Sequence, residues 1–213
     1  MANSEHQEHS KANVDQVLLE FDGKRDVLIV FAEKTRGLIQ AFLEDGKIRY
    51  QSIQARVKNR EKLRRKYVDE TKNYAGLNDI TDQVAFRVIT YYEDEVDRVA
   101  EIIKREFDVD SARSIDKRET EPEKFGYYAL NYVCKYNGQR ESQTEYRKYA
   151  GIFCEIQIVS ILRHAWSEIE HPWYDLKPAY PATIKRRFAR MAALLEIAES
   201  EFLNLRQIQS DYR

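Results

Sequence analysis

The sequence has 213 residues, of which 43% are apolar and 33% are charged, and its formal net charge is −1. This composition supports one domain with a core, and the near-zero charge excludes a protein that binds polyanions over its whole surface. No apolar run reaches the ~18 residues of a membrane span, and the first residues lack the apolar stretch of a signal peptide. We therefore expect a cytoplasmic protein without membrane contact, in which Cys134 and Cys154 are buried reduced thiols.

The first half of the chain predicts helices around one strand. Residues 1–12 are polar and without periodicity, which predicts a disordered tail. Apolar residues recur at helical spacing over residues 25–44, and Gly46 follows as a stop signal. The next expected elements are a helix at 59–72, a strand within 79–92 and an amphipathic helix at 95–107.

The second half predicts two strands followed by helices. The strands are expected within 125–136 and 150–160, and the helices at 161–171 and 183–206. The most economical assembly of these elements is an α+β fold, with one mixed sheet flanked by helices. The apolar stripe of the last helix is expected to be core or a dimer surface, with core the commoner outcome.

Two polar residues, Glu155 and Gln157, interrupt the most strand-like segment of the chain. Strand alternation puts both on one face and Cys154, Ile156 and Ile158 on the other. The apolar face can pack against helices while the polar face opens into a cleft. The same rule places Tyr127 and Asn131 on a common face, so the two polar faces would line one pocket if the strands are neighbours.

The helix at 161–171 has a polar stripe of His164, Glu168 and His171. Their spacing at i, i+4 and i+7 has the geometry of a metal site. Zinc helices usually have the tighter H-E-x-x-H arrangement, and a His/Glu stripe on a solvated helix face is common without any metal. Both interpretations stay open on the residues alone.

The stretch RVKNREKLRRK at residues 56–66 contains seven Lys or Arg residues and a single Glu. Such a run is often a solvated helix face, but triphosphate also needs several cations at one spot. If the start is extended, Arg56 and Lys58 share a face; if a helix follows, Lys62 and Lys66 share another.

Glycine-rich phosphate loops of the G-x-x-x-x-G-K-[ST] and G-x-G-x-x-G types are absent from the sequence. A nucleotide enzyme built on this chain must therefore bind phosphate with side chains. Asp82 and Glu155, each at a strand end or on a cleft face, are then natural candidates for Mg²⁺ ligands.

The order of these residues resembles the RelA/SpoT-type alarmone synthetases, specifically their small single-domain members. The matching blocks are RVK with the following lysines, D-x-x-A-x-R at 82–87, GY at 126–127, EIQI at 155–158 and AWSEIEH at 165–171. The resemblance implies a nucleotidyltransferase-like synthetase fold at 13–178 with a C-terminal helical extension at 179–213. It also implies a pyrophosphokinase that moves the β,γ-diphosphate of ATP to a ribose 3′-hydroxyl.

The resemblance further implies a role for each matching residue. The ATP contacts would be Arg56, Lys58, Lys62, Lys66 and Arg87. Asp82 and Glu155 would be the catalytic carboxylates that hold Mg²⁺, with Glu155 also a base for the attacking hydroxyl. The acceptor would meet Lys124, Tyr127, Asn131 and Gln157, with Tyr127 stacking on its base.

Several acceptor-side residues depart from the family pattern. The usual GYRSLH is GYYALN here, so Asn131 replaces histidine, and Val159 stands where EIQIRT has arginine. Lys62 replaces a serine. Fewer cations near the acceptor predict that GDP and GTP are poor acceptors, and that Val159→Arg with Asn131→His improves their use. Nearby cations such as Lys124 or Arg163 could instead replace the missing ones.

Three functions remain open on the sequence. The family default is synthesis of guanosine tetraphosphate from GDP or GTP. The second is a toxin that pyrophosphorylates the tRNA 3′ end or makes an adenosine alarmone, and the third is a degenerate nucleotide-binding module. The expected partners are ATP and a nucleotide acceptor, with tRNA, an antitoxin protein or a second copy bound through the C-terminal helix as further options.

Overall fold

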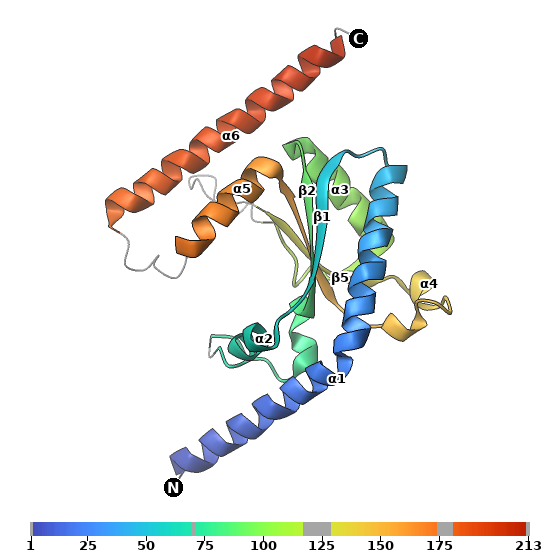
Figure 1. The fold of residues 1–213 in the computed structure, drawn as a ribbon, viewed down its shortest axis with the longest axis vertical. Coiled ribbons are helices and arrows are strands. Elements are labelled where there is room, and N and C mark those ends of the chain that lie inside the picture. Colours follow the sequence, from blue (N-terminus) through green and yellow to red (C-terminus); the bar gives the residue numbers. More distant parts are fainter. Residues whose placement is uncertain (1, 70, 117–128, 174–180, 212–213) are drawn as a thin grey trace.

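The computed structural model describes residues 2–69, 71–116, 129–173 and 181–211, and a mixed sheet forms its centre (Figure 1). The strand order is β1-β2-β6-β5-β3, and β4 pairs with β5. β2 and β6 run parallel and the other pairs antiparallel. The strands are β1 (Tyr50–Val57), β2 (Val84–Thr90), β3 (Phe107–Val109), β4 (Ile115–Asp116), β5 (Leu130–Tyr136) and β6 (Cys154–Ser160).

Helices flank this sheet on both faces, as predicted. α1 and α3 cover one face, while α5 and α6 lie on the other side (Figure 1). The helices are α1 (Ala2–Asp45), α2 (Arg60–Tyr67), α3 (Glu93–Glu106), α4 (Gly138–Glu141), α5 (Ile161–Glu170) and α6 (Ala182–Asp211). Within the described ranges, no helix is long and apolar enough to cross a membrane.

The main core lies between the sheet and helices α1 and α3. Ile156 and Ile158 of β6 point into it and are fully buried, whereas Glu155 and Gln157 on the opposite face are half-buried. The predicted alternation of β6 is therefore confirmed. Cys134 and Cys154 are buried free thiols on neighbouring strands, as expected.

Helix α1 begins much earlier than the predicted start at residue 25. Val14, Val17, Leu18 and Phe21 are buried, and their spacing continues the apolar face of the helix toward the N-terminus. The backbone of residues 2–12 is also helical, where a disordered tail was expected. Polar residues of this type tolerate a helix that extends from a packed segment. The division of the chain into tail, domain and extension stays a prediction.

Gly46 ends α1 at the predicted position, and its lack of a side chain is required there. Its N–H donates to Phe42 O at 2.9 Å, and an added Cβ would lie 2.8 Å from Ile102 Cδ1 and 3.2 Å from Phe42 O. We expect Gly46→Ala to lower the free energy of unfolding by about 1–3 kcal/mol through overpacking. Chemical denaturation measures this change.

Gly37 supplies the matched control, because it lies inside α1 and an added Cβ would meet nothing within 4 Å. Gly37→Ala is expected to raise the free energy of unfolding by about 0.5–1 kcal/mol, since alanine is the better helix former. Equal effects of the two substitutions would contradict the steric account of Gly46.

Candidate active site

The strand registers assemble a polar surface on the sheet face opposite the main core. Residues paired across neighbouring strands point to the same face. Two such rows cross β1, β2, β6 and β5: the first is Arg56, Ala85, Glu155 and Val133, and the second is Gln54, Arg87, Gln157 and Asn131. The sheet therefore brings Arg56 and Arg87 beside the predicted carboxylate Glu155 and the predicted acceptor residues Gln157 and Asn131.

Asp82 lies in the 3₁₀ turn Thr81–Gln83, directly before β2, and contacts two lysines of the basic stretch. Lys58 Nζ donates a hydrogen bond to Asp82 Oδ2, and Lys66 Nζ lies 2.8 Å from Asp82 Oδ1. Lys58 is held at the end of β1 because its N–H donates to Gln83 O at 2.8 Å. Lys66 lies on α2, whose N-cap residue is Asn59. The side chain of Asn59 accepts a hydrogen bond from the N–H of Glu61 at 2.8 Å.

The charges of this group perturb one another. Burial raises the pKa of Asp82, but the Lys58 and Lys66 ammonium groups together lower it by more than burial raises it. The pKa of Asp82 therefore lies below its usual value. The pKa of Lys58 is lowered, chiefly by burial, although Asp82 opposes that change. Burial also acts against the charge of Lys66, but the contact with Asp82 outweighs it and raises the pKa of that lysine. Asp82 is therefore a carboxylate at neutral pH.

Glu155 differs from Asp82 because it has no such lysine partner. Burial raises the pKa of Glu155, and the negative charge of Asp82 adds to the rise. Within the part of the chain that the structure describes, the Glu155 carboxylate accepts no hydrogen bond, whereas each oxygen of Asp82 contacts a lysine ammonium group. The Glu155 oxygens are therefore available to a cation, and those of Asp82 become available when the lysines move to another anion.

This donor set fits Mg²⁺. Mg²⁺ prefers carboxylate oxygen and usually binds through one or two carboxylates together with substrate phosphates. Asp82 and Glu155 supply two neighbouring carboxylates, of which Asp82 is paired with Lys58 and Lys66 and Glu155 feels the negative charge of Asp82. No cluster of three or more His, Cys, Asp or Glu residues suited to a metal occurs among the residues described. A two-carboxylate site completed by substrate is the arrangement these residues allow.

Arg87 lies at the centre of a second polar group. Its Nε donates to Gln157 Oε1 at 2.6 Å, and its NH1 donates to Glu168 Oε1 at 2.6 Å and lies 3.2 Å from His164 Nδ1. Gln157 Nε2 in turn donates to Asn131 Oδ1 at 3.2 Å. Two members of the predicted His/Glu stripe thus contact an arginine. The partner of the stripe was missed because it lies on β2, 81 residues earlier in the chain than Glu168.

The other predicted site residues make no contact with Asp82 or Arg87 among the described residues, or lie outside the described ranges. Lys62 is exposed on α2, and Arg56 is exposed on the edge strand β1. Lys124 and Tyr127 lie outside the described residues. Of the predicted ATP contacts, Lys58 and Lys66 meet at Asp82, whereas Arg87 belongs to the group around Gln157.

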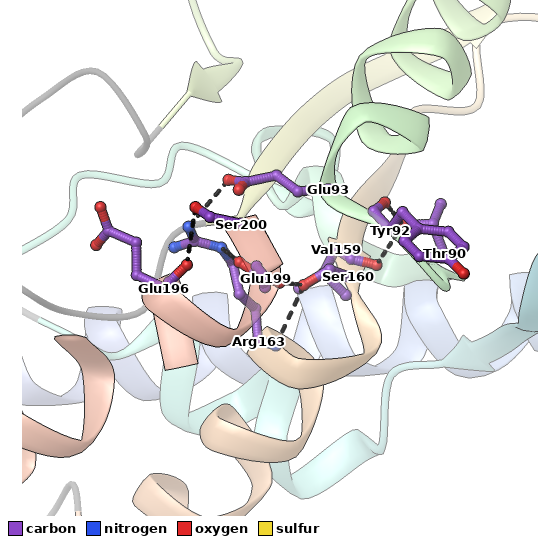
Figure 2. Close-up of polar contacts among 9 residues, drawn as sticks. All are labelled: Thr90, Tyr92, Glu93, Val159, Ser160, Arg163, Glu196, Glu199 and Ser200. Atoms are coloured by element: carbon purple, nitrogen blue, oxygen red, sulfur yellow. Dashed lines mark hydrogen bonds and ion pairs between the residues drawn. The ribbon is translucent and has the colours of Figure 1, made fainter. Parts of the chain in front are cut away.

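Val159 shares the polar face of β6 but is only 1% exposed. The nearby Arg163 donates to Glu199 Oε2 at 2.8 Å and to Glu93 Oε1 at 2.9 Å (Figure 2). The position at which the family pattern has an arginine is therefore buried in this protein. Arg163, a candidate replacement for that arginine, is bound to two carboxylates.

Comparison with known proteins agrees with this geometry. The family profile described as a region found in RelA / SpoT proteins matches residues 55–177. A GTP pyrophosphokinase family protein from Streptococcus pneumoniae is 21% identical, with a TM-score of 0.71 over 91% of this chain and 96% of that one. The small alarmone synthetase 1 from Bacillus subtilis, solved with its product pppGpp, is 20% identical, with a TM-score of 0.67 over 89% and 95%.

A third similar structure is the complex between the Type VI effector Tas1 and its immunity protein, with 17% identity and a TM-score of 0.54 over 87% of this chain and 97% of that one. A search of curated proteins gives no match. The solved structures confirm the predicted synthetase fold. The profile covers more than half of the sequence and includes Asp82, Arg87, Glu155 and Gln157. The chain therefore belongs to the RelA/SpoT family of pyrophosphokinase-like synthetases.

Proposed function

We propose that this protein transfers the β,γ-diphosphate of ATP to the ribose 3′-hydroxyl of a nucleotide acceptor, with Mg²⁺ held by Asp82 and Glu155. The observation that supports this most is the meeting of two carboxylates with Lys58 and Lys66 beside the polar sheet face. Two carboxylates with adjacent cations are suited to a triphosphate and its metal. The B. subtilis relative has been solved with pppGpp and with AMPCPP, which supports nucleotides as substrates.

Catalysis of this transfer depends on position and charge. When bound, Mg²⁺ supplies positive charge to the phosphate oxygens on which negative charge develops. Lys58 and Lys66, which in the free protein contact Asp82, turn their ammonium groups toward the triphosphate and hold it. Arg56, on the same face as Glu155, adds a planar cation for phosphate or adenine.

Glu155 is the proposed base for the attacking hydroxyl. A base needs an unoccupied oxygen and a pKa close enough to the working pH to accept a proton. Burial and Asp82 raise the pKa of Glu155 toward that range, and within the described ranges no hydrogen bond occupies its carboxylate. Asp82, bound to two lysines and with a lowered pKa, is better suited to binding the metal than to taking a proton.

The identity of the acceptor allows a second candidate function. The Tas1 structure is that of a Type VI effector bound to its immunity protein. In this chain the acceptor side departs from the family pattern at three basic positions, because Tyr128, Asn131 and Val159 stand where the pattern has Arg, His and Arg. A toxin that modifies adenosine nucleotides or the tRNA 3′ end would need fewer guanosine phosphate contacts, and its partner would be an antitoxin protein. An oligomer through α6 is compatible with either function.

Transfer from labelled ATP to GDP, GTP, ATP or tRNA in the presence of Mg²⁺ distinguishes these functions. We expect GDP to be a poor acceptor, with a Michaelis constant above the upper end of the usual range at about 1 mM. Each missing charge-assisted contact weakens binding roughly ten- to a hundredfold. A GDP Michaelis constant within the usual range would contradict this, and transfer to none of the four would indicate a degenerate binding module.

The structure changes one expectation about how GDP use would be restored. Val159 is 1% exposed, so Val159→Arg would bury a guanidinium. We now expect this substitution to destabilise the fold, because an unpaired buried charge is costly. Asn131→His, at a half-buried position on the polar face, remains the useful test of a restored acceptor contact.

A further inference from the structure

We propose that Glu168 and His164 of α5 are positioning residues that fix Arg87 and, through Gln157, orient Asn131 so that its amide N–H faces the acceptor nucleotide. This inference rests on the proposed function and adds a specificity-determining contact to it. The four hydrogen bonds of this relay join α5, β2, β6 and β5 into one polar chain. Asn131 would donate to a hydrogen-bond-accepting atom of the acceptor.

The direction of the relay follows from the chemistry of its first member. An arginine guanidinium has only donors, so the atom of Gln157 that faces Arg87 Nε at 2.6 Å must be its carbonyl oxygen. The amide nitrogen of Gln157 then points the other way, where it meets Asn131 Oδ1 at 3.2 Å. That contact uses the carbonyl of Asn131 and leaves its NH₂ group as the end of the relay.

The other end of the relay is anchored on α5. Arg87 NH1 donates to Glu168 Oε1 at 2.6 Å and lies 3.2 Å from His164 Nδ1, so this nitrogen accepts only if it is unprotonated. Burial and the positive charge of Arg87 lower the pKa of His164, which favours the neutral ring. Glu168 and His164 thus hold one side of the guanidinium while Gln157 holds the other. Without them the guanidinium can rotate, and the orientation of both amides is no longer fixed.

Asn131 is well placed to use the remaining donor. It lies half-buried on β5, opposite Gln157 and on the same sheet face as Glu155. In the described parts of the chain, its amide nitrogen donates to no other group. A nucleotide whose 3′-hydroxyl approaches Glu155 would therefore meet the amide N–H of Asn131. This donor lies on β5, and β6 separates it from Arg87 on β2.

A double-mutant cycle on the acceptor Michaelis constant tests the relay. Asn131→Ala should raise that constant roughly 3- to 10-fold, as expected for one lost hydrogen bond, and Glu168→Gln should raise it by a comparable factor. In the Asn131→Ala background, Glu168→Gln should change the constant less than about twofold, because the group it orients is gone. Equal effects of Glu168→Gln in both backgrounds would overturn the proposal.

Two further measurements exclude other causes. The control Glu170→Gln removes a carboxylate from the same helix and should leave the acceptor constant unchanged; an equal rise would mean that α5 acts only through its charge or stability. The side-chain amide NMR signals of Asn131 should shift in Glu168→Gln even if the protein transfers to no acceptor. Unchanged Asn131 signals would refute the relay independently of the proposed function.

Discussion

Glu155→Gln is expected to lower the rate of pyrophosphate transfer on the order of 100- to 1,000-fold, while the protein stays folded. Glutamine keeps the shape of the side chain but removes a charge from the proposed metal site and cannot accept the proton of the attacking hydroxyl. The fold is expected to persist because Glu155 accepts no hydrogen bond from the residues described, and its burial already raises the pKa toward the neutral form. Rates at saturating Mg²⁺ and ATP measure the effect.

Asp82→Asn should lower activity to a similar extent but should also reduce stability. Lys58 and Lys66 both lose the charge of their partner in that variant, and Lys58 is already disfavoured as a cation by burial. Comparing unfolding and activity in the two variants separates metal binding from structure. Glu61→Gln, which removes an exposed carboxylate of α2, serves as the control. Retention of most activity by Glu155→Gln would mean that the metal is bound elsewhere.

The sequence predicted which residues of β6 face the site but not what they meet there. Period-two alternation is a local property, so the common face of Glu155 and Gln157 could be read directly. The contacts of these residues depend on strand order and register, which pair Glu155 with Ala85 and Gln157 with both Arg87 and Asn131. Local patterns contain no such long-range information, and the family resemblance supplied only roles.

The basic stretch shows the same limit. The chain enters it through the edge strand β1, which the sequence suggested only as an extended start at residues 56–58. The antiparallel register of β1 with β2, together with the short turn before β2, brings Lys58 to Asp82. Lys62 and Lys66 share a helix face in sequence, yet the structure brings Lys66 to the carboxylate and leaves Lys62 exposed. Spacing along α2 does not decide between the two lysines, because it does not encode where the helix lies relative to Asp82.

Long-range ion pairs were the least predictable feature. Arg163 lies in α5, and its two carboxylate partners come from α3 and α6, 70 and 36 residues away. In the sequence it is one arginine among many. The predicted apolar stripe of α6 gave no sign that Glu199 is buried, and three of its members, Met191, Leu194 and Phe202, are exposed. The Arg163–Glu199 pair joins α5 to α6, and it motivates the second large prediction.

Arg163→Met is expected to lower the free energy of unfolding by about 3–5 kcal/mol, the usual cost of breaking a buried ion pair from one side. Glu199 of α6 is only 4% exposed, accepts a hydrogen bond from Ser160 at the end of β6 and pairs with Arg163 of α5 (Figure 2). Burial raises its pKa, while Ser160 and Arg163 act against that rise. Removing the guanidinium leaves a buried carboxylate without its cation.

The pH dependence of this loss has a definite sign. Without Arg163, the pKa of Glu199 in the folded state rises further above its unfolded value of 4.5. The folded state then binds a proton more tightly than the unfolded state, so the variant gains relative stability below the unfolded pKa and loses it as pH rises. The difference from the wild-type protein should therefore shrink on acidification. A difference that grows toward low pH would contradict the assignment.

Arg206→Met provides the matched control, because Arg206 also joins α6 to α3 but is 33% exposed, where it pairs with Asp94 and lies 3.8 Å from Glu95. Its removal should cost less, about 1 kcal/mol, because the partner that it contacts most closely, Asp94, is 45% exposed.

The double variant Arg163→Met with Glu199→Leu tests the cause directly. It removes both charges together and replaces them with apolar side chains of similar length. Replacement of a buried ion pair by packed apolar groups is often close to neutral, so most of the stability lost in Arg163→Met should return. Denaturant unfolding of the wild-type protein, Arg163→Met, Arg206→Met and the double variant measures this recovery. A double variant no more stable than Arg163→Met would show that the arginine acts through its own packing or its pair with Glu93, and not by neutralising Glu199.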